Sequence, residues 1–171
     1  RNSTHLSLAK DLLETCTALY SRSQTGIGPE SALFNTYPEG DEDWEAVSPK
    51  YLLRPETLES LFILWRTTKD SKYRDRAWTI WTKIEAHCRT PLAYSGLVDV
   101  NGGRSSDGEG NWNDSMQSFF FAETLKYLFL IFSDDTLIPL DKYVLTTEAH
   151  PLRIFNPKTP HVAPQHRTST R

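Results

Sequence analysis

The chain has 171 residues, the length of one domain, and its 38% hydrophobic and 12% aromatic residues suffice for a packed core. Its formal net charge of −3 provides no basic surface, so nucleic acid is not an expected partner. No apolar run reaches the roughly 18 residues of a membrane-spanning helix, so we expect no transmembrane segment. Because the sequence starts at Arg1 without an initiator methionine or a signal-like stretch, we interpret it as a fragment or a processed product.

The first part of the chain has the hydrophobic spacing of helices. Apolar residues recur every three or four positions over residues 4–22, which predicts a first helix with Thr4 as its N-cap. Residues 55–69 predict a second helix, and residues 72–87 predict a third helix capped by Ser71. The short link between the second and third helices predicts that they pack antiparallel.

Extended pieces and loops are expected between these helices. Residues 32–34 predict a short extended segment, whereas the acidic residues 39–45 predict a solvated loop. After the third helix, residues 91–100 predict another extended segment. Residues 101–110 then predict a loop rich in glycine, serine and aspartate.

The last predicted helix covers residues 115–132 and has aromatic and aliphatic residues on nearly every side, so we expect it to be largely buried. Residues 143–147 predict a short strand, and residues 157–171 predict a loose tail. The expected fold class is therefore all-α, built from helical hairpins with short β segments. Alternating strands and helices are missing from the sequence pattern, which argues against a Rossmann-type sheet.

Arginine and glutamate side chains gather at the start of the second predicted helix. Pro55 suits a first helical turn, so Glu56 and Glu59 lie one turn apart on the same side, with Arg54 beside them. Carboxylates are favourable at a helix N-terminus. The arrangement is either a salt-bridged helix start or a place where a guanidinium and carboxylates hold a polar ligand.

Glu123 is the least expected residue of the fourth helix, because its neighbours are aromatic and apolar. An ionised carboxylate buried without partners is costly, so it must pair with Lys126 or Arg54, or face a cation or ligand. Phe119 lies one turn earlier on the same face. An aromatic ring beside a carboxylate is typical of a sugar-binding site.

Thr147 and Glu148 follow the predicted strand and offer hydroxyl, carbonyl and carboxylate oxygens, which are the hard ligands that Ca²⁺ prefers. Surface residues of a strand give the same pattern. Glu30, which follows Gly28 and Pro29, is either a turn residue or a ligand.

The remaining chemistry-bearing residues concern covalent modification. Cys16 and Cys88 either form one disulfide or remain buried free thiols, and no cysteine cluster indicates zinc. Asn2 and Asn113 begin Asn-x-Ser/Thr tripeptides, which accept glycans in the secretory pathway.

Five motifs in a fixed order carry a resemblance to a known family. They are Glu14-Thr15-Cys16, Gly26-Ile27-Gly28-Pro29-Glu30, the nine residues 52–60, the run MQSFFFAETLKYLFLIF over 116–132, and TTEAHP over 146–151. They span the chain to about Phe155. The sequence therefore resembles glycoside hydrolase family 47, the class I α-1,2-mannosidases that trim high-mannose N-glycans on glycoproteins.

This resemblance implies an (α/α)7 barrel whose helices line a funnel closed at one end by a β-hairpin. Residues 1–155 would be the last third of that catalytic domain, and residues 156–171 a tail. The family hydrolyses with inversion, using one carboxylic acid to protonate the leaving oxygen and one carboxylate to activate water. Its general acid and a further catalytic aspartate correspond to positions before Arg1, so we expect this chain alone to be inactive.

The resemblance also implies a role for each candidate residue. Glu56 matches the general base, Arg54 a residue that binds mannose or orients the carboxylates, and Phe119 the ring on which the terminal mannose packs. Thr147 matches a direct Ca²⁺ ligand through its carbonyl and hydroxyl oxygens. The glutamates that would hold the coordinating waters or the sugar are Glu30, Glu59, Glu123 and Glu148.

Three further expectations follow from the resemblance. Gln117 stands where the family commonly has glutamate, and Cys16 matches half of a disulfide whose other half precedes Arg1, so Cys16 and Cys88 are not expected to pair. The disulfide and the acceptor tripeptides agree with the ER lumen, the Golgi lumen or secretion. The rival interpretation is a lectin-like relative that binds mannose glycans in glycoprotein degradation without efficient trimming.

Overall fold

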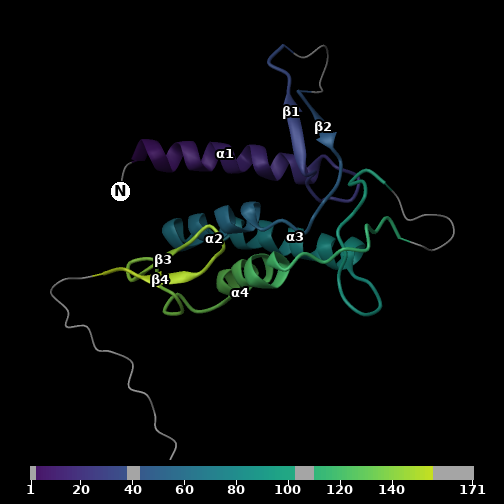
Figure 1. The fold of residues 1–171 in the computed structure, drawn as a ribbon. Helices are drawn as coiled ribbons and strands as arrows, with labels where there is room; N and C mark the ends of the chain where they lie inside the picture. Colours follow the sequence, from purple (N-terminus) through teal and green to yellow (C-terminus); the bar gives the residue numbers. More distant parts are fainter. Residues whose placement is uncertain (1–2, 38–42, 103–109, 156–171) are drawn as a thin grey trace, which may run out of the picture.

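The structure is a computed structural model that describes residues 3–37, 43–102 and 110–155. Its helices are α1 (Ser3–Ser21), α2 (Glu56–Thr68), α3 (Lys72–Cys88), the π-helical segment η1 (Phe120–Leu125) and α4 (Lys126–Phe132). Its strands are β1 (Ser31–Phe34), β2 (Trp44–Ser48), β3 (Tyr143–Leu145) and β4 (Pro151–Arg153). The prediction of a mainly helical fold with short β segments is confirmed (Figure 1).

Helix α2 is the centre of the packing, because it contacts α1, α3, η1 and α4. Pro55 precedes its first turn, where its missing N–H group is not needed. The helix ends where Lys69 adopts a left-handed conformation with φ of 63° and donates its N–H to the Trp65 carbonyl at 2.9 Å. The predicted boundaries of this helix and of α3 are right to within one or two residues.

The core between these helices is built from aromatic and aliphatic side chains. Phe62 of α2 and Tyr127 of α4 are fully buried, and their ring centroids lie 5.8 Å apart. Burying one such ring contributes about 2 to 3 kcal/mol to stability. The core therefore ties α2 firmly to α4, the helix that continues η1.

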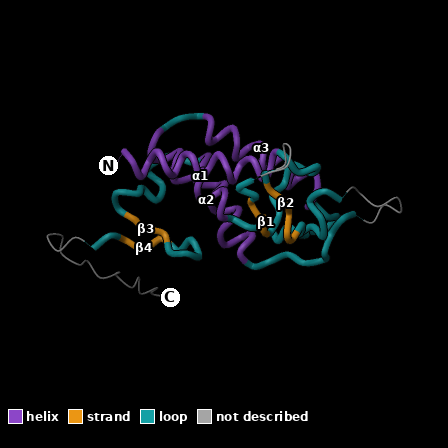
Figure 2. The backbone as a smooth tube through the Cα atoms, turned by 90° about the horizontal axis from the view of Figure 1, so that it is seen from above, coloured by secondary structure: helices purple, strands orange, loops and turns teal. Residues whose placement is uncertain are grey.

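Two antiparallel hairpins lie at opposite ends of the helical layer, as Figures 1 and 2 show from two directions. In the first, β1 pairs with β2, and Phe34 lies opposite Trp44. In the second, Leu145 of β3 pairs with Pro151 of β4. The strand β2 includes the end of the acidic stretch that was predicted to be a loop, so that part of the prediction is wrong.

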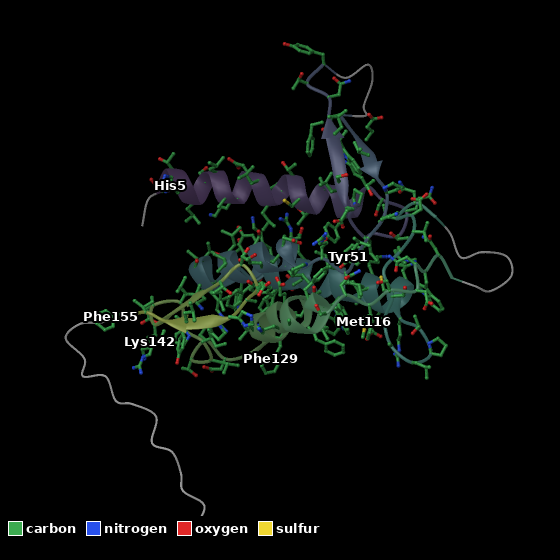
Figure 3. All side chains as sticks on the ribbon, viewed as in Figure 1. His5, Tyr51, Met116, Phe129, Lys142 and Phe155 are labelled. Atoms are coloured by element: carbon green, nitrogen blue, oxygen red, sulfur yellow. The ribbon has the colours of Figure 1, made fainter. Side chains whose placement is uncertain are left out.

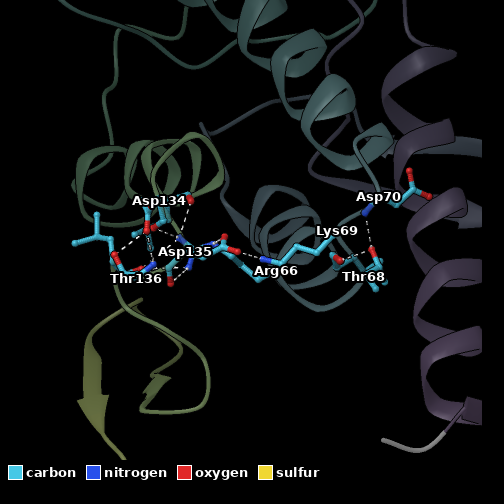
Figure 4. A network of polar contacts seen from close by, with 10 residues as sticks. Arg66, Thr68, Lys69, Asp70, Asp134, Asp135 and Thr136 are labelled. Carbon is cyan, nitrogen blue, oxygen red and sulfur yellow. Dashed lines mark hydrogen bonds and ion pairs between the residues drawn. The ribbon is translucent and has the colours of Figure 1, made fainter.

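A buried arginine fastens the end of α4 to α2 (Figure 4). The guanidinium of Arg66 donates to backbone carbonyls of Leu130, Asp134, Asp135 and Leu137 at 2.9 to 3.3 Å, and it forms an ion pair with the Asp135 carboxylate. Such carbonyls at a helix C-terminus lack intrahelical donors. Arg66 satisfies them and so fixes where the chain leaves α4 toward β3.

The fourth predicted helix differs from expectation in two ways. Helical structure begins only at about residue 119, because Asn113 and Ser115 pair with the backbone of Gly96 and Asp114 has a φ of 53°. The helix is also only half buried: Phe121 and Phe129 are 61% and 64% exposed, and Phe129 is labelled in Figure 3. Among the described residues nothing covers this side, which is why an all-round apolar sequence did not give a buried helix.

The other predictions have mixed outcomes. The extended residues 32–34 lie in β1, and the predicted strand over 143–147 is present but shorter, as β3. Residues 91–100 form isolated bridges, not a named strand. The tail 156–171 and most of the loop 101–110 lie outside the described residues. Within the described ranges no helix has the length and apolar character needed to cross a membrane.

Candidate functional site

The site begins at a tight chain turn before α2. Leu53 is fully buried with a φ of 62°, a conformation that few residues other than glycine adopt. This turn directs the next side chain, Arg54, toward a glutamate 24 residues earlier in the sequence. Arg54 donates Nε–H and Nη2–H to Glu30 Oε1 at 2.9 and 2.6 Å. Arg54 therefore pairs with Glu30, and Glu56 at the start of α2 remains exposed.

Glu30 is positioned by its backbone and by a glycine. Its N–H donates to the Lys50 carbonyl at 2.7 Å. At Gly28 a Cβ atom would lie 2.6 Å from the Tyr20 ring, so no larger residue fits there without movement. The second carboxylate oxygen of Glu30, Oε2, is buried and has no hydrogen-bond partner among the described residues. This buried oxygen is therefore available to accept a hydrogen bond from a water or a ligand.

An aromatic ring completes this part of the site. The Arg54 guanidinium carbon lies 5.1 Å from the centroid of the Phe119 ring, which is half-buried just before η1. A cation over a ring face at this distance is attracted by the ring quadrupole. Phe119, Arg54 and Glu30 thus lie together although they come from three separate stretches of the chain.

Four glutamates from three elements form the acidic part of the site. Burial raises the pKa of Glu123, and the neighbouring carboxylates of Glu56, Glu148 and Glu59 raise it further. Lys126 lowers this pKa by a smaller amount. The elements are α2, η1 and the turn between β3 and β4. The carboxylates of Glu56, Glu59 and Glu148 thus lie near enough to Glu123 to act on it, whereas the fifth predicted glutamate, Glu30, pairs with Arg54.

The proposed pairs for Glu123 have other roles in the structure. Arg54 binds Glu30, and the Lys126 ammonium donates to the Ala149 carbonyl at 2.9 Å. Three other carboxylates thus raise the pKa of Glu123, and Lys126 offsets them in part. Carboxylates that act on one another in this way favour a bound cation.

Thr147 and Glu148 lie on the tight turn that joins β3 to β4, and both are exposed. The Ala149 N–H donates to the Thr146 carbonyl at 2.9 Å, and the His150 N–H donates to Thr146 Oγ1 at 3.1 Å. Ala149 is buried with a φ of 57°. Thr146 thus holds the turn closed, and no described residue donates a hydrogen bond to the oxygens of Thr147.

Tyr127 belongs to this region although the sequence reasoning missed it. Its hydroxyl is buried and lies beside the Glu59 carboxylate. Burial raises the pKa of Tyr127, and the nearby Glu59 carboxylate raises it further. The signal in the sequence was its position four residues after Glu123, on the same helix face.

The positions that departed from expectation or carried modification motifs have structural roles. Gln117 donates its side-chain N–H to Ser115 Oγ at 3.1 Å. Asn113 Oδ1 accepts from the Ser115 N–H and from Ser95 Oγ, while Asn2 lies outside the described residues. Cys16 and Cys88 are both free thiols here, and only Cys88 is fully buried.

The raised pKa of Glu123 predicts a pH-dependent stability. Because its pKa in the folded protein lies above the ordinary value of 4.5, ionising it costs stability as the pH rises above about 4.5. In the presence of a chelator, Glu123→Gln should therefore have a higher melting temperature than the unmodified protein, by a margin that grows from pH 4.5 to 7. Thermal unfolding followed by circular dichroism measures this margin. The exposed Glu45→Gln in β2 is the matched control, and an equal margin at every pH would contradict the prediction.

Comparison with known proteins places this geometry in a family. The family model "Glycosyl hydrolase family 47" matches residues 1–154. The chain belongs to this family. The resemblance seen in the five sequence motifs is thereby confirmed.

Several relatives of known activity are similar to the chain. It is 47% identical over 150 residues to mannosyl-oligosaccharide alpha-1,2-mannosidase IA of Spodoptera frugiperda, covering 88% of this chain and 22% of that protein. It is 46% identical over 158 residues to the endoplasmic reticulum mannosyl-oligosaccharide 1,2-alpha-mannosidase of Rattus norvegicus, covering 90% of this chain and 23% of that protein. The chain thus spans less than a quarter of the length of these relatives.

A solved structure agrees with the family. The alpha-1,2-mannosidase from Trichoderma reesei superposes with a TM-score of 0.74 at 37% sequence identity, covering 84% of this chain and 33% of that one. The described helices and hairpins therefore have the arrangement of about a third of a family 47 mannosidase.

Proposed function

We infer that the protein containing this chain removes terminal α-1,2-linked mannose from high-mannose N-glycans by an inverting, Ca²⁺-dependent hydrolysis. The observation that carries this inference is the convergence of Arg54, Phe119 and the glutamates around Glu123. The names of the relatives, mannosyl-oligosaccharide mannosidases, supply the substrate. By analogy with the solved structure, the chain would form about a third of an (α/α)7 barrel.

Each residue has a proposed part in binding or proton transfer. The Phe119 ring would pack on the apolar face of a mannose, and Arg54, held by Glu30, would bind hydroxyl groups beside it. Glu56 is exposed at the start of α2, and its carboxylate would take the proton from the attacking water. The general acid is proposed to lie in the part of the catalytic domain that this chain does not span, so we expect the chain alone to be inactive.

The donor set fits a hydrated Ca²⁺ ion. Glu30 Oε2 is a buried oxygen without a partner among the described residues, and a cation would offset the repulsion on Glu123. Among the described residues no group of three acidic, histidine or cysteine side chains is arranged to chelate a metal directly. We propose Thr147 as the direct protein ligand through its hydroxyl and carbonyl oxygens, with Glu59, Glu123 and Glu148 acting through water. When bound, the ion supplies fixed positive charge that orients sugar hydroxyls.

A location in the secretory pathway is proposed on the substrate alone, since N-glycans are carried by proteins of the ER, the Golgi and the cell exterior. The lectin-like alternative is not favoured, because the relatives are named as mannosidases and Glu56 is retained in an exposed position.

Hydrolysis by the full-length protein tests the proposal. With an α-1,2-linked mannose oligosaccharide, proton NMR should detect β-mannose as the first-formed product, because attack from the face opposite the leaving oxygen inverts the anomeric carbon. A chelator should stop the reaction, and added Ca²⁺ should restore it. First-formed α-mannose would contradict inversion, and activity that persists in chelator would contradict the metal requirement.

A further inference from the structure

Two non-glycine residues in left-handed conformations flank the candidate site. Leu53 immediately precedes Arg54 and has a φ of 62°, and Ala149 immediately follows Glu148 and has a φ of 57°. Both are fully buried. A residue with a Cβ atom in this conformation costs about 1 kcal/mol or more, and it persists only where its surroundings enforce it. Neighbouring groups must therefore hold these two backbone positions.

The carbonyl oxygens of both residues accept hydrogen bonds from one helical segment. Thr124 Oγ1 donates to the Leu53 carbonyl at 2.6 Å, and this threonine is fully buried. Lys126 Nζ donates to the Ala149 carbonyl at 2.9 Å. Both donors flank Glu123 closely in the sequence. One segment thus contacts both strained positions and carries the carboxylate on which the other glutamates converge.

The helical geometry lets two nearby side chains reach different elements. Residues two apart on a helix point about 200° away from each other, so Thr124 and Lys126 project to roughly opposite sides. Thr124 lies in the π-helical segment η1 and faces the turn before α2, whereas Lys126 is the first residue of α4 and faces the turn between β3 and β4. π-Helical turns are frequent where side chains of a site must be re-aimed.

We propose that Thr124 and Lys126 are positioning residues that set the two halves of the site separately: Thr124 fixes Arg54 and Glu56 through the Leu53 carbonyl, and Lys126 fixes Thr147 and Glu148 through the Ala149 carbonyl. This inference rests on the proposed function, because it assigns one half to the hydrolytic water and the other to Ca²⁺. Neither residue contacts the sugar in this scheme. Thr124 acts through a backbone carbonyl, and Lys126 does so as well while its charge also acts on Glu123.

If the two halves are set separately, each substitution should impair one property of the full-length protein and spare the other, which we call a crossed pattern. Thr124→Val keeps the shape of the side chain but removes the donor, so kcat at saturating Ca²⁺ should fall about tenfold with Ca²⁺ affinity unchanged. Lys126→Met should weaken Ca²⁺ binding about tenfold, measured by calorimetry, while kcat recovers at saturating Ca²⁺. Thr124→Ser and Lys126→Arg retain a donor and should restore most of the lost property.

Hydrogen exchange supplies a readout that does not depend on catalysis. Lys126→Met should speed exchange of the Ala149 and His150 amides about tenfold and leave the Glu59 amide, which donates to the Pro55 carbonyl, unchanged. Thr124→Val should instead speed exchange of the Glu59 amide and leave the Ala149 and His150 amides unchanged. Because exchange is measured on folded protein, a variant with a lowered melting temperature still gives a result.

The inference is supported if each substitution speeds hydrogen exchange only in its own half of the site and impairs only the kinetic or binding property assigned to that half. Equal acceleration of both segments, or none in either, would overturn it, since a merely structural role moves both together. If the unmodified protein hydrolyses no mannose linkage but the exchange pattern still crosses, the proposed function falls and the positioning roles of the two residues stand.

Discussion

Replacing Glu56 by glutamine in the full-length protein should lower kcat at least about a hundredfold and leave the affinity for the mannose glycan nearly unchanged. Glutamine has the size of glutamate but cannot accept the proton of the attacking water. Glu56 is exposed at the start of α2 and Arg54 pairs with Glu30, so the substitution breaks no ion pair among the residues that the structure describes. Steady-state kinetics and glycan binding by calorimetry measure the two quantities.

The matched control for this substitution is Glu45→Gln. Glu45 is an exposed glutamate of β2, in the hairpin at the far end from β3 and β4, and it should retain normal turnover. A normal kcat in Glu56→Gln would show that another group activates the water. A loss of glycan binding equal to the loss of kcat would instead assign Glu56 to substrate binding.

Thr147→Val should reduce Ca²⁺ affinity by at least about tenfold, because valine keeps the shape of threonine but removes the hydroxyl oxygen. The turn itself should survive, since its internal hydrogen bonds are made by Thr146, Ala149 and His150. Calorimetry of the metal-free protein with Ca²⁺ measures the change.

Thr147→Ser is the matched control because it retains the hydroxyl, and its Ca²⁺ affinity should stay within a few-fold of the original. Thr147→Val with unchanged affinity would remove the proposed direct ligand. In that case the cation, if bound at all, would be held by the glutamates around Glu123 alone.

Much of the secondary structure could be predicted because it depends on local patterns. The apolar spacing of α2 and α3 and the proline before Glu56 are properties of short stretches, and both helices are where the sequence placed them. The fourth helix was predicted to begin too early. Asn113 and Ser115 pair with the backbone of Gly96, which lies 17 and 19 residues before them in the sequence, and this pairing competes with helix formation. Helix propensity depends on the local sequence alone and therefore cannot predict this competition.

The individual site residues could also be named from the sequence, but not their partners. Arg54 was a candidate because an arginine precedes two glutamates, yet its partner is Glu30, which depends on the left-handed turn at Leu53. Tyr127, Thr124 and Lys126 were not named as site residues, because their roles are defined by a carbonyl or carboxylate distant in the sequence.

The sequence by itself determined the family and the mainly helical class, and it named the candidate acidic and aromatic residues of the site, because these follow from local motifs in a fixed order. Only the tertiary structure decided which groups meet: that Arg54 binds Glu30, that three other carboxylates act on Glu123, and that one π-helical segment and its continuation donate to two strained turns. The reason is physical. Pairing of charges and hydrogen bonds depends on distance in space, and the chain brings residues 23 to 71 positions apart together only when α2 packs against η1 and the β3–β4 turn lies beside Lys126.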